Sequence, residues 1–200
     1  MNNKKISIVL LIFFSIVIST CSESTNPILP PDTEPDELVP LKIGNSWSFK
    51  ITTYDTLGAI DWIDTLTFFI KKDTAINNVL WFLQGSNRTM LGQTGFRNDT
   101  IGHHVTNFES YSITYPYPAE VGESLDGFTV TSKDSLFQTN LGKLKCYVYN
   151  RYFYDFSYNT IYSPGIGLIY SETPMRPYNS DTTYLIQTRE LVSTNVQLKQ

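Results

Sequence analysis

Histidine and cysteine are scarce in this chain of 200 residues, which contains two of each. The two histidines, His103 and His104, are adjacent, and neighbouring residues of a strand point to opposite faces, so they cannot easily share a metal ion. Cys146 has no cysteine or histidine partner at the spacing of a metal-ligand set. We therefore expect no metal centre, and we expect the histidine pair to lie in an exposed loop.

The motifs of common catalytic sites are also missing. A serine-hydrolase elbow needs Gly-x-Ser-x-Gly because its strained turn requires small flanking residues, and "GESLDG" carries Asp126 where the second glycine should stand. No glycine-rich phosphate loop is present. Asp61 and Asp64 are a pair of carboxylates of the kind that acid–base catalysis uses, but acids that flank strands are usually solvated. The sequence predicts a protein that is not an enzyme and takes no cofactor.

Positive charge is in short supply as well. The chain has 15 basic and 19 acidic residues, and its net charge is −4. A protein that binds nucleic acid needs a basic surface to neutralise phosphates, so nucleic acid is not an expected partner.

No apolar run is long enough to cross a bilayer. The run from Ile6 to Ile18 follows Lys4 and Lys5 and has 13 apolar or small residues, whereas a transmembrane helix needs about 20. A short basic region, an apolar run of this length and a polar continuation are typical of a secretory signal. Residues 1–20 are therefore predicted to be a signal peptide.

The end of this signal resembles a lipobox, the bacterial motif whose cysteine receives a diacylglyceryl group. The resemblance covers Ile18-Ser19-Thr20-Cys21, with an aliphatic residue three positions before the cysteine. It implies that Cys21 is lipidated and anchors the protein to a membrane of the bacterial cell envelope. Ser22 resembles an outer-membrane sorting signal. The alternative is ordinary signal cleavage, which would leave a Cys21–Cys146 disulfide conceivable.

A tether and a single domain follow the signal. Residues 21–40 contain five prolines and five acidic residues, and proline together with mutual repulsion of acids favours disordered or polyproline-II backbone. Residues 41–200 are enough for one β-rich globular domain with a substantial core.

Alternating apolar and polar residues dominate this domain. In "NSWSFKITTY" the residues Trp47, Phe49 and Ile51 share one face. Similar segments follow, separated by turn-forming pairs such as Asn77-Asn78 and Asp126-Gly127. No helical stripe of 12 or more residues is present. We expect an all-β fold in which seven to ten strands form an antiparallel meander, shaped as a half-open barrel or a curved sheet.

One short pattern occurs twice. "PLKIGNSW" and "PAEVGESL" share Pro-x-x-Ile/Val-Gly-x-Ser and a following large apolar residue. We interpret both as turns that lead into a strand, with Gly44 and Gly122 in a conformation closed to other residues. Chance similarity of eight residues is the alternative.

Tyrosine is the unusual abundance of the chain. Eight aromatic residues fall between Tyr147 and Tyr162. The alternation of "KLKCYVYN" places Cys146 on an apolar face as a buried small residue and places Tyr147 and Tyr149 on the opposite face. Because tyrosine combines an apolar ring with a polar tip, a ligand or partner surface is predicted at Tyr147, Tyr149, Tyr152 and Tyr154. The alternative is that tyrosines cover the outer face of a sheet and brace cross-strand pairs.

Three stretches also resemble bacterial envelope lipoproteins to which no activity is assigned. They are "VPLKIGNSWSFK", "TNLGKLKCYVYNRY" and "YSPGIGLIYSE". The resemblance implies an antiparallel β domain, cupped like the half-barrels that carry lipids and lipoproteins in the envelope.

Together these features predict a membrane-anchored envelope lipoprotein, on the outer membrane, that acts as a non-catalytic binding module for an apolar or amphiphilic ligand. The alternative is a structural or interaction lipoprotein whose tyrosine-rich face binds glycan or an envelope protein. The expected partners are thus the membrane, through the anchor, and a lipid, a glycan or a protein of the envelope.

Overall fold

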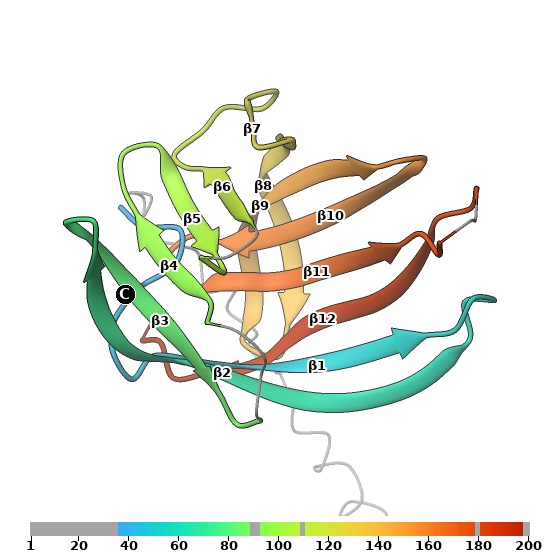
Figure 1. Cartoon of the computed structure of the whole chain (residues 1–200), viewed down its shortest axis with the longest axis horizontal. Helices are drawn as coiled ribbons and strands as arrows, with labels where there is room; N and C mark the ends of the chain where they lie inside the picture. The colour runs from blue at the N-terminus through green and yellow to red at the C-terminus, as the bar shows by residue number, and fades with distance from the viewer. Residues whose placement is uncertain (1–35, 89–92, 109–110, 179–180, 198–200) are drawn as a thin grey trace, which may run out of the picture.

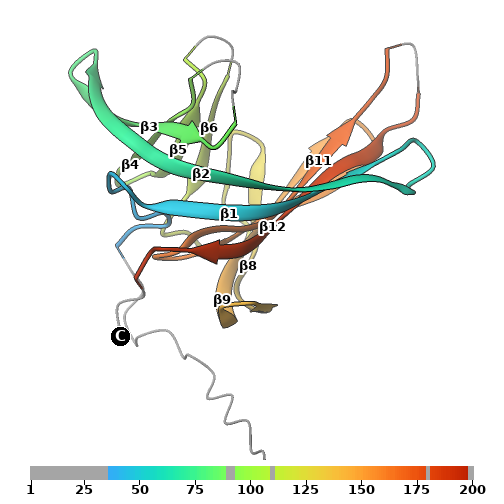
Figure 2. The same ribbon diagram turned by 90° about the horizontal axis from the view of Figure 1, so that it is seen from below.

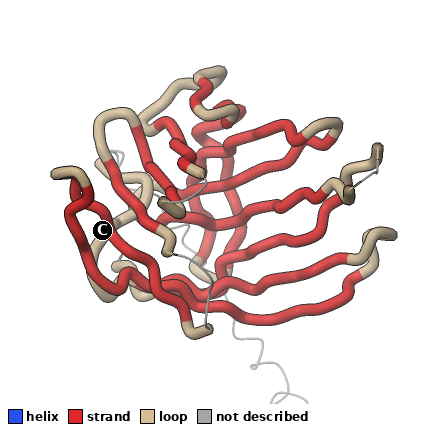
Figure 3. The backbone as a smooth tube through the Cα atoms, in the orientation of Figure 1, coloured by secondary structure: helices blue, strands red, loops and turns tan. Residues whose placement is uncertain are grey.

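The computed structural model describes residues 36–88, 93–108, 111–178 and 181–197. All regular elements in these ranges are strands, as the colouring of Figure 3 shows. They are β1 (Ser46–Tyr54), β2 (Ile60–Ile76), β3 (Val79–Ser86), β4 (Gly95–Asn98), β5 (Gly102–Thr106), β6 (Ser112–Pro116), β7 (Ser124–Leu125), β8 (Phe128–Thr139), β9 (Gly142–Phe153), β10 (Phe156–Ser163), β11 (Gly167–Met175) and β12 (Tyr184–Thr194). Over the same ranges, a search for helices long and apolar enough to span a bilayer finds none.

The strands form one antiparallel sheet in the order β6-β5-β4-β3-β2-β1-β12-β11-β10-β9-β8-β7. Neighbours in sequence pair with each other up to β6 and again from β7, while β1 pairs with β12 in the middle of the sheet. The sheet curls until β6 contacts β7 and β8 at the opposite edge. The result is a nearly closed barrel with one seam (Figures 1 and 2). The predicted all-β antiparallel meander in a half-open barrel is confirmed.

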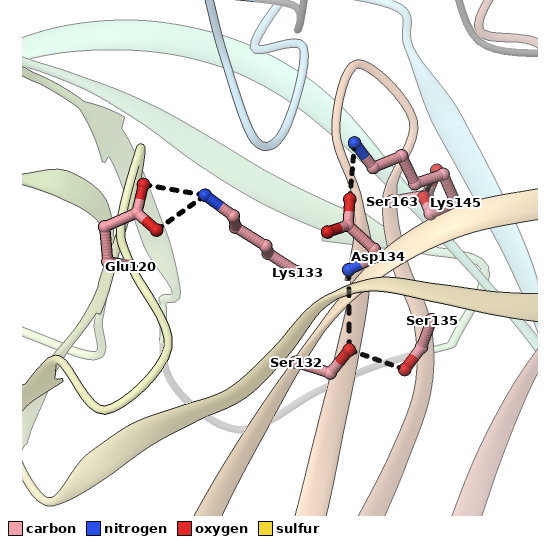
Figure 4. A network of polar contacts seen from close by, with 7 residues as sticks. All are labelled: Glu120, Ser132, Lys133, Asp134, Ser135, Lys145 and Ser163. Carbon is pink, nitrogen blue, oxygen red and sulfur yellow. Dashed lines mark hydrogen bonds and ion pairs between the residues drawn. The ribbon is translucent and has the colours of Figure 1, made fainter.

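Side chains and a loop, rather than a ladder of backbone hydrogen bonds, hold the seam. The hydroxyl of Tyr149 on β9 donates to the Pro116 carbonyl at the end of β6, at 2.9 Å. In the loop between β6 and β7, the carboxylate of Glu120 accepts two hydrogen bonds from Nζ of Lys133 on β8, at 2.6 and 2.7 Å (Figure 4). These contacts tie β6 to β9 and the loop after β6 to β8.

The repeated sequence pattern forms the same turn twice, as predicted. Gly44 and Gly122 have φ values of +90° and +96°, in the left-handed region that favours glycine. The Gly44 N–H donates to the Ile70 carbonyl at 2.9 Å, and the Gly122 N–H donates to the Val130 carbonyl at 2.8 Å. In both turns the residue after the glycine accepts a return bond from that same strand residue, at 2.9 Å. The two similar segments therefore form the same kind of turn before a strand.

The packed domain begins before the predicted boundary at residue 41. Leu38 and Val39 belong to the core, with exposed fractions of 1% and 8%. The Asn98 side chain donates to the Val39 carbonyl at 2.7 Å, and the Gly165 N–H donates to the Glu37 carbonyl at 2.9 Å. The proline and acid content of residues 21–40 therefore placed the predicted boundary a few residues after the point where the packed domain begins. The predicted signal peptide, Cys21 and most of the predicted tether lie outside the described residues.

Candidate ligand cavity

A cavity of about 590 Å³ lies inside the curled sheet. Every strand except β7 contributes to its wall. Most of the lining side chains are aromatic or aliphatic, among them Trp47, Phe49, Phe68, Phe96 and Leu168. A largely apolar cavity of this volume, with a few polar groups, is typical of a site for a small molecule.

A cluster of aromatic rings forms one wall of the cavity. The ring of Tyr115 lies 4.6 Å from that of Phe128, 4.8 Å from that of Tyr162 and 5.2 Å from that of Tyr149, measured between centroids. These tilted and edge-on contacts are the arrangements that aromatic pairs prefer. Burial raises the pKa of Tyr115 to about 12 and that of Tyr162 well above its usual value. The wall is therefore uncharged at neutral pH.

His103 completes this wall and its neighbour faces away. The His103 ring stacks on Phe96 at 5.6 Å between centroids, and Nδ1 lies 2.8 Å from Oδ1 of Asn98. His104 instead has Nε2 2.9 Å from Asp99 Oδ2 and Nδ1 3.0 Å from the Thr114 hydroxyl. The predicted opposite orientation of the two side chains is thus confirmed.

The predicted exposure of the histidine pair is wrong, because both residues lie in β5 and are buried, with exposed fractions of 2% for His103 and 8% for His104. Burial and, secondarily, the charge of His104 lower the pKa of His103 to about 3, so it is neutral at pH 7. Within the described residues, no group of three or more His, Cys, Asp or Glu side chains is placed to hold a metal ion.

Two arginines bring positive charge into the apolar cavity. The guanidinium of Arg189 on β12 lies over the Phe68 ring, with Cζ 5.9 Å from the centroid. The guanidinium of Arg151 on β9 lies over the Phe128 ring, at 5.0 Å. In the ranges that the structure describes, neither arginine forms an ion pair with a carboxylate. The cavity therefore combines an apolar wall with unneutralised positive charge.

The sequence carries a signal for both arginines. Arg151 has the same strand parity as Tyr147 and Tyr149, and Arg189 has the parity of Leu191. An arginine that shares a strand face with buried apolar residues is unusual, because charged side chains are rarely buried without a partner. This pattern marks Arg151 and Arg189 as candidate site residues.

Of the four tyrosines predicted to form a surface, the structure buries two and exposes two. Tyr147 and Tyr149 are buried, with exposed fractions of 1% and 0%, so their assignment to a surface is wrong. Their rings face the interior, where they pack on each other and on other tyrosines. Tyr152 and Tyr154 are exposed at the turn between β9 and β10, with fractions of 71% and 67%. They do not line the cavity, but Phe153 between them does.

Cys146 is buried as predicted, with an exposed fraction of 0%. Burial raises the pKa of its thiol to about 12, so the thiolate that reacts as a nucleophile is not formed at neutral pH. The residue packs in the hydrophobic core as a small apolar group.

No protein-family model matches the chain, and no curated protein matches it. Two solved structures resemble it in fold. A Bacteroides fragilis protein, described as exported and as having a YmcC-like fold, is 13% identical over 78% of this chain and 98% of its own, with a TM-score of 0.44. A Parabacteroides distasonis protein, described as a lipoprotein, is 13% identical over 82% of this chain and 100% of its own, with a TM-score of 0.42. Likeness of this degree assigns no activity to the chain.

Proposed function

We propose that this protein is a membrane-anchored, non-catalytic binding module of the bacterial cell envelope whose cavity holds an apolar or amphiphilic ligand. The observation that carries the proposal is the cavity of about 590 Å³ inside the curled sheet, lined by rings such as Trp47, Phe49 and Phe68. Removing apolar ligand surface from water contributes about 25 cal/mol per Å². A ligand with a hydrocarbon portion would therefore gain most from this wall.

The location follows from the sequence. The lipobox-like segment that ends at Cys21 supports an anchor in the envelope, and Ser22 supports the outer membrane as the destination. The chemistry of the cavity supports a binding role over catalysis, because its histidine, His103, is buried with a pKa lowered to about 3 and cannot serve as a base near neutral pH.

The test is ligand capture by the mature chain without its anchor residue Cys21, that is from residue 22 onward, purified without detergent after mixing with bacterial envelope extract. We expect native mass spectrometry to show a reproducible added mass that organic solvent releases. We also expect the neutral probe N-phenylnaphthylamine to bind with enhanced fluorescence. A bare protein mass together with no probe binding would refute the proposal.

A second candidate function rests on the exposed tyrosines of the β9–β10 turn. Tyr152 and Tyr154 remain available for a partner outside the cavity. If they bind an envelope protein or glycan, the double substitution Tyr152→Ser and Tyr154→Ser will abolish partner pull-down while leaving N-phenylnaphthylamine binding intact. The matched control is Tyr178→Ser, which alters a tyrosine that is 95% exposed on the β11–β12 connection.

A further inference from the structure

Arg189 is a cation inside an apolar cavity with no anion beside it. Its Nε donates a hydrogen bond to Oε1 of Gln187 at 3.2 Å, and its guanidinium lies over the Phe68 ring. The described residues supply no further hydrogen bond or ion pair to this side chain. The outer guanidinium nitrogens, which carry most of the donors of an arginine, are left for another group.

The acidic residue of the cavity wall does not neutralise Arg189. Glu172 lines the cavity, but its Oε2 accepts from the Asn159 N–H at 2.7 Å and its Oε1 lies 3.3 Å from the Tyr170 hydroxyl. Burial lowers the pKa of Arg189, and the side chains that act against this shift are three tyrosines, Tyr111, Tyr162 and Tyr115. None of the groups that act on the guanidinium is a carboxylate.

Such an arrangement is costly to the empty protein. Arg189 is half-buried, and even partial burial of a charge is unfavourable unless it is paired and hydrogen-bonded. The cation–π contact with Phe68 offsets only part of that cost. A ligand that brings its own anion offsets this cost, because a guanidinium forms strong, bidentate hydrogen bonds with a carboxylate or phosphate.

A second guanidinium adds to the positive field. The guanidinium of Arg151 lies over the Phe128 ring. It also acts on Tyr158, where burial raises the pKa and the nearby Arg151 opposes part of that rise. Like Arg189, it has no carboxylate partner among the described residues. The cavity wall thus carries two arginines and one acid, Glu172, whose carboxylate oxygens already have hydrogen-bond partners, while most of the other lining side chains are apolar.

We propose that the cavity selects amphiphiles with an acidic headgroup, a carboxylate or a phosphate, and that Arg189 binds this headgroup while the hydrocarbon portion packs against the aromatic wall. This inference rests on the proposed function, since it names the ligand class of the same cavity. The aromatic wall favours any apolar chain, whereas the arginine distinguishes an acid from a neutral molecule of the same length.

The test compares ligands that differ only in the headgroup. Dodecanoate, dodecyl phosphate and dodecanol are titrated against the mature chain at neutral pH and low salt, by displacement of N-phenylnaphthylamine. We expect at least one of the two acids to bind about tenfold or more tightly than dodecanol, since a hydrogen bond to a charged group is worth roughly one such factor or more. Which acid binds better separates a fatty-acid-like ligand from a phospholipid-like one.

Two substitutions assign the preference to Arg189. Arg189→Met keeps the apolar stem and removes the charge, so we expect the acid preference to fall to about parity while dodecanol binds as before. Arg189→Lys keeps the charge and loses the planar fork, so we expect an intermediate preference. The matched control is Arg176→Gln, which removes an arginine that pairs with Asp181 outside the cavity wall and should leave the preference unchanged.

The ligand-free melting temperature separates headgroup binding from a structural role. Because Arg189→Met removes a half-buried cation that has no carboxylate partner among the described residues, the variant should melt no lower than the parent protein. Equal binding of acids and dodecanol by the parent, or full acid preference in Arg189→Met, would overturn the inference and leave the proposed function standing. Failure of N-phenylnaphthylamine and of all three amphiphiles to bind would refute the proposed function, and the headgroup inference with it.

Discussion

Tyr149 offers the sharpest test of how the barrel is closed. Its side chain is fully buried, and its hydroxyl donates to the buried Pro116 carbonyl at 2.9 Å, which links β9 to the end of β6. Tyr149→Phe deletes this hydroxyl and keeps the ring contacts with Tyr115 and Tyr162. The substitution therefore isolates the polar link across the seam from the packing of the aromatic wall.

The expected loss of stability in Tyr149→Phe follows from the lost hydrogen bond. A buried hydrogen bond contributes about 1 kcal/mol, and a buried acceptor that loses its partner costs about 1–3 kcal/mol. We expect the free energy of unfolding to fall by about 1–3 kcal/mol and the melting temperature to fall by roughly 2–12 °C for a domain of this size. Urea denaturation followed by tryptophan fluorescence gives the first quantity, with an unchanged m-value because the fold is retained.

Matched variants show whether the reasoning holds. Tyr152→Phe removes a hydroxyl from a side chain that is 71% exposed on the same strand, so its effect should stay within about 0.5 kcal/mol. Tyr149→Ser removes the ring as well and should cost about 3–5 kcal/mol, as other deletions of a buried aromatic do. A Tyr149→Phe variant as stable as the parent would show that the seam does not depend on this link.

Two further predictions concern buried titratable groups. His103 has a pKa of about 3 in the folded protein against 6.5 when exposed, so between these values the unfolded chain binds the proton and stability falls as the pH drops below about 6.5, by up to about 1.4 kcal/mol per pH unit. Urea denaturation between pH 7 and pH 5 should show a smaller loss in His103→Gln, and an equal loss in both proteins would contradict a neutral buried histidine. Cys146, whose pKa burial raises to about 12, should resist a thiol reagent at about pH 8 in the folded protein and react fully in urea; rapid labelling without denaturant would show that the thiol is accessible.

Several local features of the fold are readable from the sequence because they depend on near neighbours. Asn77 and Asn78 take φ values of 53° and 62°, and they form the turn between β2 and β3 that an Asn-Asn pair between two apolar runs predicts. Gly44 and Gly122 form equivalent turns for the same reason. Each of these conformations is set by the steric limits of a few adjacent residues.

The strands β4 to β6 have weak sequence signals, and their lengths explain why. They have four or five residues, "GFRN", "GHHVT" and "SITYP", which are too short for an alternation to stand out. Their stability comes from pairing with neighbours and from burial of His103 and Tyr115 against the aromatic cluster. Histidine next to histidine looks like a polar loop until the partners Asn98 and Asp99 are placed beside it.

The tyrosine assignment failed for a related reason. Alternation correctly separates Cys146 from Tyr147 and Tyr149, but it does not tell which face of a strand a curled sheet encloses. Lys143 and Lys145 share the parity of the two tyrosines and suggested a solvent-facing side. In the structure Lys145 pairs with Asp134 (Figure 4) while Tyr147, two residues on, is buried, so the same strand face passes from partly exposed to enclosed.

The short strands β4 to β6 also contribute to the cavity. The diameter of a barrel grows with the number of strands, and about eight strands leave an interior that side chains fill or that holds one small ligand. A sheet of seven to ten strands would be compatible with a packed interior, whereas the twelve observed strands enclose more space than their side chains occupy. Rings such as Tyr115, Tyr149 and Tyr162 fill one side of that space, and Arg189 lies in the wall of what remains. The short strands β4 to β6, which carry weak sequence signals, therefore add Phe96, His103 and Tyr115 to the wall of the cavity, and the proposal of an acidic ligand rests on Arg189 in the same wall.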